Sequence, residues 1–159
     1  MVDLYLDREF GKTSKSKLVG VHPDLVFLCY QVLYHSPYDI GVHCGVRTEE
    51  EQERMIEIKA SWTMDSKHRL RVFEEIEEPV SGAIDFHVYD GTGQHFNLAS
   101  LRRVYEEAWS PLSVEYKIPI AWGGHWRGDK KDGPHIQLAT RSRLWVRKQE
   151  SDQTLIGEV

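Results

Sequence analysis

Residues 83–89 read Ala-Ile-Asp-Phe-His-Val-Tyr. Apolar and polar side chains alternate along it, and the Asp90-Gly91 pair that follows is a turn signal, so the pattern predicts a β-strand with one buried face. Asp85 lies inside that strand among apolar neighbours. A buried carboxylate without a partner is costly, so Asp85 predicts a cation or strong hydrogen-bond donors close by.

Further strands are predicted on both sides of this stretch. Residues 40–46 form a short, partly β-branched segment with glycines at both ends, which favours a strand. Towards the C-terminus, 120–126 and 135–139 are predicted as the last two strands, and the polar loop 127–134 joins them.

Two helices are predicted before residue 60 from apolar spacing and capping residues. Pro23 suits the first turn of a helix whose apolar positions continue to Tyr34. Thr48 and Glu51 match a capping box at the start of a second helix, which is expected to run to about Lys59.

A third helix is predicted from Asn97, a good capping residue, through Trp109, where Ser110-Pro111 breaks or kinks the pattern. Helices come first and strands then alternate with helix. This order predicts an α+β fold, a small single domain with a mainly antiparallel sheet and flanking helices. The domain is expected to span residues 1–159, with its core at about 20–140.

Two parts of the chain lack the hydrophobic periodicity of a helix or a strand. The first 20 residues are rich in Gly, Ser and Lys and are expected to form an irregular lead-in. Residues 61–80 are interpreted as loop, and four glutamates make 71–80 an acidic insertion. That insertion is either a hairpin or flap beside a cleft, or a solvated acidic loop, and we favour the loop.

Composition excludes several classes of protein. The 159 residues are 40% hydrophobic and 28% charged, which is typical of one globular domain. The net charge of −5 argues against a general nucleic-acid binder. Apolar stretches fall far short of the roughly 20 residues that a membrane-spanning helix needs, so the protein is not expected to be membrane-embedded. The N-terminal residues lack the apolar segment of a secretory signal.

The two cysteines, Cys29 and Cys44, do not form a CxxC pair, so any metal here must be held by His and carboxylate groups. Cys44 directly follows His43. Because adjacent strand residues point to opposite faces, a nucleophilic Cys–His pair is not expected, and Cys44 is expected to pack inward.

Three residues form a candidate metal site: His68, Asp85 and His135. Two His and one Asp leave a fourth tetrahedral position for water, which is the ligand set of a catalytic zinc. Asp132, three residues before His135, is well placed to take a proton from that water. His87 is expected on the same strand face as Asp85, as an outer contact of the site or an alternative ligand.

These residues resemble the motifs of the M15 zinc peptidases and, within them, the L-alanyl-D-glutamate peptidases found as bacteriophage endolysins. The residues of the family pattern SxHxxGxAxD occur in the same order as Ser66, His68, Gly82, Ala83 and Asp85. Its second half is present as Trp122-Gly123-Gly124, Trp126, Asp132, Pro134 and His135. Upstream, residues 20–25 and 45–48 with Gln52 also match. The chain departs from the pattern in the insertion 71–80 and at His125, where relatives often carry Asp.

The resemblance implies a Hedgehog/DD-peptidase-like fold and hydrolysis of the bond between L-Ala and D-Glu in the peptidoglycan stem peptide. Zn²⁺ would be held by His68, Asp85 and His135, and Asp132 would be the catalytic base.

The resemblance also implies a set of substrate contacts. Arg47 would bind a substrate carboxylate or the developing oxyanion, since a guanidinium forks onto a carboxylate with two parallel bonds. Gln52, Ser66 and Trp122 are the other expected substrate contacts, and His125 is either a further contact or neutral.

The leading hypothesis is a phage endolysin for host cell lysis, without a separate cell-wall-binding domain. Such a protein is expected to be a monomer made in the host cytoplasm, to reach the cell wall through a separate holin, and to bind no nucleic acid. Two alternatives stay open: a D-Ala carboxypeptidase of the same family, and a non-catalytic peptidoglycan-binding protein.

Overall fold

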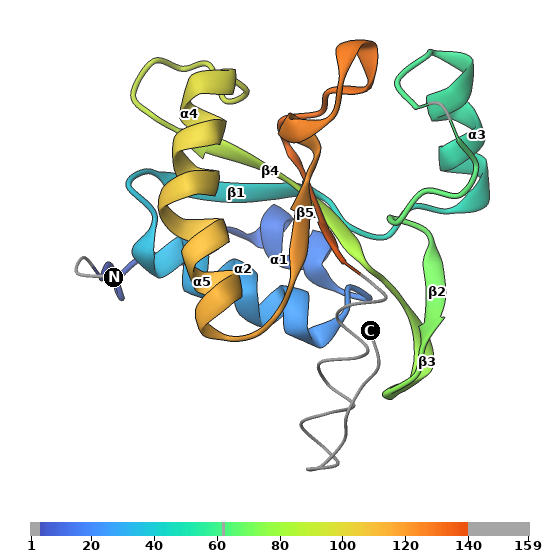
Figure 1. Ribbon diagram of the computed structural model, residues 1–159, viewed down its shortest axis with the longest axis horizontal. Coiled ribbons are helices and arrows are strands. Elements are labelled where there is room, and N and C mark those ends of the chain that lie inside the picture. Colours follow the sequence, from blue (N-terminus) through green and yellow to red (C-terminus); the bar gives the residue numbers. More distant parts are fainter. Residues whose placement is uncertain (1–3, 62, 140–159) are drawn as a thin grey trace.

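A four-stranded antiparallel sheet in the order β1-β4-β6-β5 forms the centre of the protein (Figure 1). Its structure, a computed structural model, describes residues 4–61 and 63–139. The strands are β1 (Asp39–Cys44), β4 (Ala83–Tyr89), β5 (Ile120–Trp122) and β6 (His135–Leu138). The predicted α+β class with a mainly antiparallel sheet is confirmed.

The two faces of the sheet lie in different environments, which β4 shows most clearly. Its apolar residues Ile84, Phe86 and Val88 are fully buried against the helices. The alternate side chains, Asp85 and His87, are only partly buried on the opposite face. The alternation predicted for residues 83–89 therefore separates a core face from a face that is open to a ligand.

Helices cover the core face. They are α2 (Pro23–His35), α4 (Leu98–Val104) and α5 (Ser110–Glu115), with the π-helical turn η1 (Tyr105–Trp109) between the last two. In Figure 1, α4 and α5 form one column. Pro111 does not break the predicted third helix, which continues from α4 through η1 into α5 and ends at Glu115.

The helix α3 (Glu49–Glu57) lies at the far side of the molecule from this column (Figure 1). It begins with the predicted capping box: the Glu51 backbone N–H donates to the Thr48 hydroxyl, and the Thr48 N–H donates to the Glu51 carboxylate. Among the described residues, every helix is too short or too polar to traverse a lipid bilayer.

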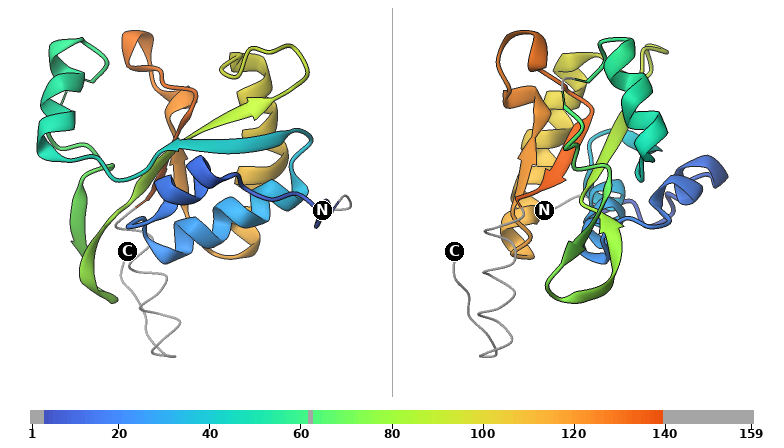
Figure 2. Two further views of the ribbon diagram at one scale, coloured as in Figure 1. Left: turned by 180° about the vertical axis from the view of Figure 1, so that it is seen from behind. Right: turned by 90° about the vertical axis from the view of Figure 1, so that its right-hand side faces the viewer.

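The prediction of an irregular lead-in was wrong, because α1 (Lys12–Leu18) is a helix that lies over β1 (Figure 2). The polar composition concealed a short inward-facing stripe of Ser14 and Leu18, four residues apart. The Ser14 hydroxyl accepts a hydrogen bond from the Val42 N–H at 3.0 Å, and Phe10 joins the core. The core therefore begins about ten residues before the predicted start.

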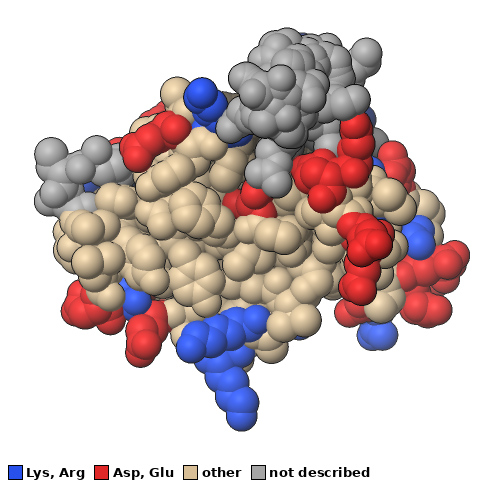
Figure 3. All heavy atoms as spheres, turned by 90° about the horizontal axis from the view of Figure 1, so that it is seen from below, with Lys and Arg blue, Asp and Glu red and all other residues tan. Residues whose placement is uncertain are grey.

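The prediction of a loop over the insertion was also wrong, because β2 (Leu70–Phe73) and β3 (Ile76–Ser81) form an antiparallel hairpin. Exposed Glu74, Glu77 and Glu78 masked the strand pattern. The anchor is Phe73, which is 1% exposed and packs edge-on against the His22 ring at 4.7 Å. From below, acidic groups gather on the hairpin side of a mostly uncharged surface (Figure 3).

The strand predicted over 120–126 is shorter than expected. It ends at Trp122, and the following Gly123–His125 segment, η2, is a 3₁₀ turn. A second 3₁₀ turn, η3 (Gly128–Lys130), lies in the loop before β6. Both turns lift this loop above the sheet edge (Figure 1).

The hairpin anchor gives a stability prediction. Phe73→Ala is expected to lower the free energy of unfolding by about 3 to 5 kcal/mol, because it removes a fully buried aromatic ring. Val72→Ala is the matched control, since Val72 is 75% exposed and its loss is expected to cost less than about 0.5 kcal/mol. Denaturant unfolding measures both variants, and equal effects would contradict the anchoring role.

Candidate active site

A cavity of about 1250 Å³ opens on the polar face of the sheet. One wall comes from the end of α3 and the segment after it, the floor comes from β4 and β6, and the other wall comes from the loop before β6. The acidic hairpin contributes no lining residue among those that the structure describes. The insertion therefore does not form a flap over this cavity.

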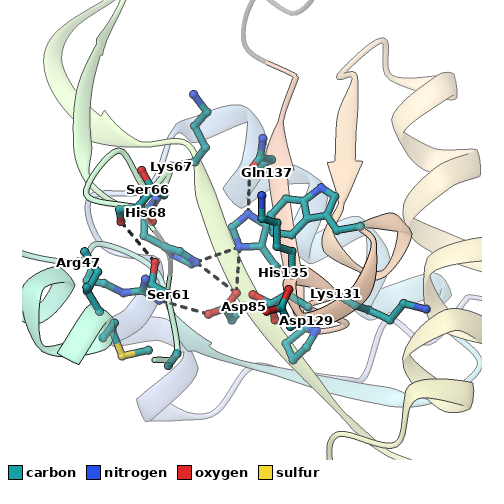
Figure 4. A pocket seen from close by; sticks show the side chains of 18 of the residues that line it. Arg47, Ser61, Ser66, Lys67, His68, Asp85, Asp129, Lys131, His135 and Gln137 are labelled. Carbon is teal, nitrogen blue, oxygen red and sulfur yellow. Dashed lines mark hydrogen bonds and ion pairs between the residues drawn. The ribbon is translucent and has the colours of Figure 1, made fainter. Parts of the chain in front are cut away.

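His68, Asp85 and His135 converge on this floor from three parts of the chain (Figure 4). His68 Nε2 lies 3.2 Å from Asp85 Oδ1 and 3.2 Å from His135 Nδ1. His135 Nδ1 lies 3.3 Å from Asp85 Oδ1. A tetrahedral ion about 2.0 to 2.2 Å from each atom would need separations of about 3.3 to 3.6 Å, so the three donors fit a metal ion with little movement.

Strand register and outer hydrogen bonds hold the three side chains. Asp85 and His135 are direct partners in the β4–β6 pair. His68 lies in the turn before β2, where its Nδ1 faces the Gly45 carbonyl at 2.8 Å and leaves Nε2 free to face the group. His135 Nε2 lies 2.8 Å from Gln137 Oε1. Such outer contacts fix the tautomer and aim of a metal-binding imidazole.

The charge of Asp85 is strongly stabilised. Burial alone would raise the pKa of Asp85, but His68 and His135 outweigh it and hold that pKa well below its usual range. Burial likewise opposes the charged form of His68, but the Asp85 carboxylate raises the pKa of His68 to about 10. The site therefore favours positive charge beside the carboxylate, whether from protons or from a cation.

Arg47 also lines the cavity, next to Asp85: its Nη2 lies 3.6 Å from Asp85 Oδ2. Its Nη1 donates to Gln52 Oε1 at 2.8 Å. Gln52 is fully buried and does not line the cavity. Predicted as a substrate contact, Gln52 is placed instead to hold Arg47, while its own amide donates to the Ser61 hydroxyl.

Asp132 lines the opposite wall. Burial raises its pKa, and the nearby charge of Asp85 raises it further. Its backbone N–H donates to the Gly123 carbonyl at 2.9 Å, and a side chain at Gly123 would overlap the Asp132 carbonyl oxygen. Glycine is therefore required at position 123 for the loop to approach this closely.

Two other predicted contacts have different positions. Ser66 lines the cavity, and its hydroxyl accepts the His68 backbone N–H at 3.2 Å. Trp122 is 1% exposed and does not line the cavity. Its indole N–H donates to the Gly133 carbonyl at 2.7 Å, and its ring stacks on Tyr105 at 4.7 Å. Trp122 thus supports the loop that carries Asp132.

A β-bulge in β1 changes the expected position of Cys44. The register shifts between Val42 and Cys44, so Cys44 lies opposite Asp85. Cys44 therefore reaches the polar face, which His43 already reaches by strand alternation. The prediction that Cys44 packs inward was wrong, because its side chain is only partly buried. Cys44 Sγ lies 3.6 Å from His68 Nδ1, the nitrogen that does not face the Asp85–His135 group.

The remaining histidines lie outside the three-donor group. His87 Nδ1 faces His43 Nδ1 at 3.1 Å. Burial lowers the pKa of His43, and burial together with His43 and His95 lowers that of His87 to about 4. His125 is exposed at the cavity, with its ring edge against Trp122.

Several known proteins that resemble this chain are peptidases. A family described as phage L-alanyl-D-glutamate peptidase matches residues 6–141. The L-alanyl-D-glutamate peptidase of Escherichia phage T5 is 25% identical over 139 residues, 82% of this chain and 97% of that protein. The crystal structure of the L-Ala D-Glu endopeptidase ChiX of Serratia marcescens has 27% identity, with a TM-score of 0.70 over 86% of this chain and 94% of that one.

The contact between His135 and Gln137 gives a prediction about metal binding. Gln137→Ala is expected to weaken metal affinity by about 10- to 100-fold, because the imidazole loses the oxygen that orients it. Gln137→Glu is the matched control, since it keeps an oxygen acceptor and is expected to retain affinity. Competition with a chelator measures both, and an unchanged affinity in Gln137→Ala would contradict the orienting role.

Proposed function

The chain belongs to the family of phage L-alanyl-D-glutamate peptidases, and we propose that it is a zinc-dependent endopeptidase that cleaves the L-Ala–D-Glu bond of the peptidoglycan stem peptide. The observation that carries this proposal is the triangle of His68 Nε2, Asp85 Oδ1 and His135 Nδ1, with sides of 3.2 to 3.3 Å. Asp132 and Arg47 line the same cavity.

His68, Asp85 and His135 would hold the zinc. When bound, Zn²⁺ supplies Lewis acidity, which polarises a carbonyl and lowers the pKa of a water molecule. His and carboxylate donors are the ligands that catalytic zinc prefers. The Cys44 sulfur lies within 4.8 Å of a donor atom of His68 and of Asp85, but it contacts His68 at Nδ1, at 3.6 Å, and we propose that it stays outside the ligand set.

Asp132 is the general base. It takes a proton from the attacking water and then gives it to the amine of D-Glu as the peptide bond breaks. Burial raises the pKa of Asp132, and this suits both steps, because a carboxylate with a higher proton affinity is a stronger base and still releases the proton to an amine.

Arg47 binds the carboxylate of D-Glu. Its side chain is 10% exposed, and Gln52 holds it in place, so its guanidinium loses little freedom on binding. The cavity as a whole supports an anionic ligand: although the chain carries −5, six Lys or Arg side chains line the cavity against four Asp. They are Arg47, Lys59, Lys67, Arg127, Lys130 and Lys131, against Asp65, Asp85, Asp129 and Asp132.

The family supports a proposal about the biological setting. We propose an endolysin that acts as a monomer, is made in the host cytoplasm, and reaches the cell wall when a separate holin permeabilises the membrane. The D-Ala carboxypeptidase is the alternative, since it would use the same metal donors and differ in the part of the cavity that accepts the chain end.

Product analysis tests the proposed function directly. Purified muropeptides are expected to yield fragments ending in L-Ala and peptides with a new D-Glu amino terminus, identified by mass. Chelation is expected to abolish the reaction and zinc to restore it. Asp132→Asn is expected to retain zinc while kcat falls by about 10²- to 10⁴-fold, because general-base catalysis is lost.

Two outcomes would contradict the proposal. Loss of a single D-Ala would identify the carboxypeptidase. Binding of muropeptides without any product, in protein whose zinc content has been verified, would identify a non-catalytic binding protein.

The role of Arg47 is tested with a pair of substrates. Arg47→Lys is expected to lower kcat/KM about 10- to 100-fold on a stem peptide whose D-Glu carboxylate is free, since a charge-assisted bond is lost. On a peptide whose D-Glu carboxylate is amidated, the same change is expected to have little effect. An equal loss on both peptides, at equal zinc content, would show that Arg47 does not contact that carboxylate.

A further inference from the structure

A second pair of imidazoles lies beside the candidate metal site. Asp85 and His87 are alternate residues of β4 on the same face, about 7 Å apart along the strand. His87 Nδ1 lies 3.1 Å from His43 Nδ1, and the ring centroids are 5.2 Å apart. His43 lines the cavity. The proposed peptidase chemistry uses neither ring.

Two features of the backbone build this pair. Strand alternation places His43 on the polar face of the sheet, because its neighbour Val42 is buried on the core face. Gly41 is the direct strand partner of His87, and the His87 ring occupies the space where a side chain at position 41 would be. The absence of a side chain at Gly41 therefore allows the His87 ring to lie across β1 and meet His43.

The pair reproduces the geometry of the two histidines in the candidate metal site. There, His68 Nε2 and His135 Nδ1 are 3.2 Å apart, and the ring centroids are 5.0 Å apart. An ion about 2.0 to 2.1 Å from two nitrogens separates them by about 2.9 to 3.4 Å in square-planar or tetrahedral geometry. The separation of 3.1 Å between His43 and His87 falls within this range.

The orientation of His87 also matches that of His135. His135 presents Nδ1 to its neighbours while Nε2 contacts Gln137, two residues further along β6. His87 presents Nδ1 to His43 while Nε2 lies 2.9 Å from the Tyr89 hydroxyl, two residues further along β4. An oxygen on Nε2 is the outer contact that fixes an imidazole with its Nδ1 lone pair directed at an ion.

We propose that His43 and His87 bind a second divalent transition-metal ion, such as Zn²⁺, through their Nδ1 atoms in the wall of the cavity. Imidazole nitrogen is a preferred ligand of Zn²⁺, Cu²⁺ and Ni²⁺. Two protein ligands leave the other positions to water or to a ligand in the cavity. The second site is therefore weaker than the site formed by His68, Asp85 and His135.

Calorimetric titration of the metal-free protein with Zn²⁺ tests the proposal. The unsubstituted chain is expected to bind two ions, one tightly and one weakly. His43→Gln and His87→Gln are each expected to weaken the second ion by more than about tenfold and to keep the first. His95→Gln is the matched control, because His95 is a neighbouring histidine whose Nδ1 contacts the Val88 carbonyl instead. It is expected to keep both ions.

The proposal does not depend on the identity of the first site, because loss of the tight ion would leave a weak ion that still requires His43 and His87. Imidazole NMR of the unsubstituted chain guards against variants that do not fold: the resonances of His43 and His87 are expected to shift with the second equivalent of Zn²⁺. Saturation at one ion, or a weak ion that persists in both folded variants, would overturn the proposal.

Discussion

The carboxylate of Asp85 is the charge on which the site depends. It lies at the middle of β4, flanked by the buried residues Ile84 and Phe86, and its side chain is 13% exposed. A carboxylate in this position must be balanced by positive charge, since removal from water disfavours its ionised form. His68, His135 and Arg47 all direct nitrogen atoms at it. The remaining parts of the fold hold these nitrogens in place.

The residues around Asp85 fall into two groups: side chains that line the cavity, and buried side chains that hold them in place. Arg47, Ser66 and Asp132 line the cavity, whereas Gln52 and Trp122 are buried behind it. A sequence motif contains both kinds of residue without distinguishing them. Hydrogen bonding and burial separate the two roles.

Local patterns were sufficient to predict much of the fold and the candidate site. The alternation of residues 83–89 predicted β4, and the capping box predicted the start of α3. His68, Asp85, His135 and Asp132 could be proposed as site residues because each falls in a motif of the family that the chain resembles, although the insertion 71–80 separates the first two. Their convergence depends on the pairing of β4 with β6, which those motifs do not encode by themselves.

The features that the sequence did not predict also have physical explanations. Helix α1 was missed because a stripe of two inward residues is too short to show a period in a polar segment. Hairpin β2–β3 was missed because its glutamates face solvent while its anchor is the single aromatic Phe73. The bulge that redirects Cys44 changes the pairing by one residue, and nothing in the local sequence marks a shift of that size.

X-ray absorption at the zinc edge of the loaded protein can show whether His68, Asp85 and His135 bind the ion. Two imidazole nitrogens at about 2.0 to 2.1 Å, oxygen ligands, and no sulfur are expected if His68, Asp85 and His135 bind zinc. The measurement is made at one equivalent of zinc, so that the tight site alone is filled. A sulfur ligand at about 2.3 Å would show that Cys44 binds the ion and would contradict the assignment.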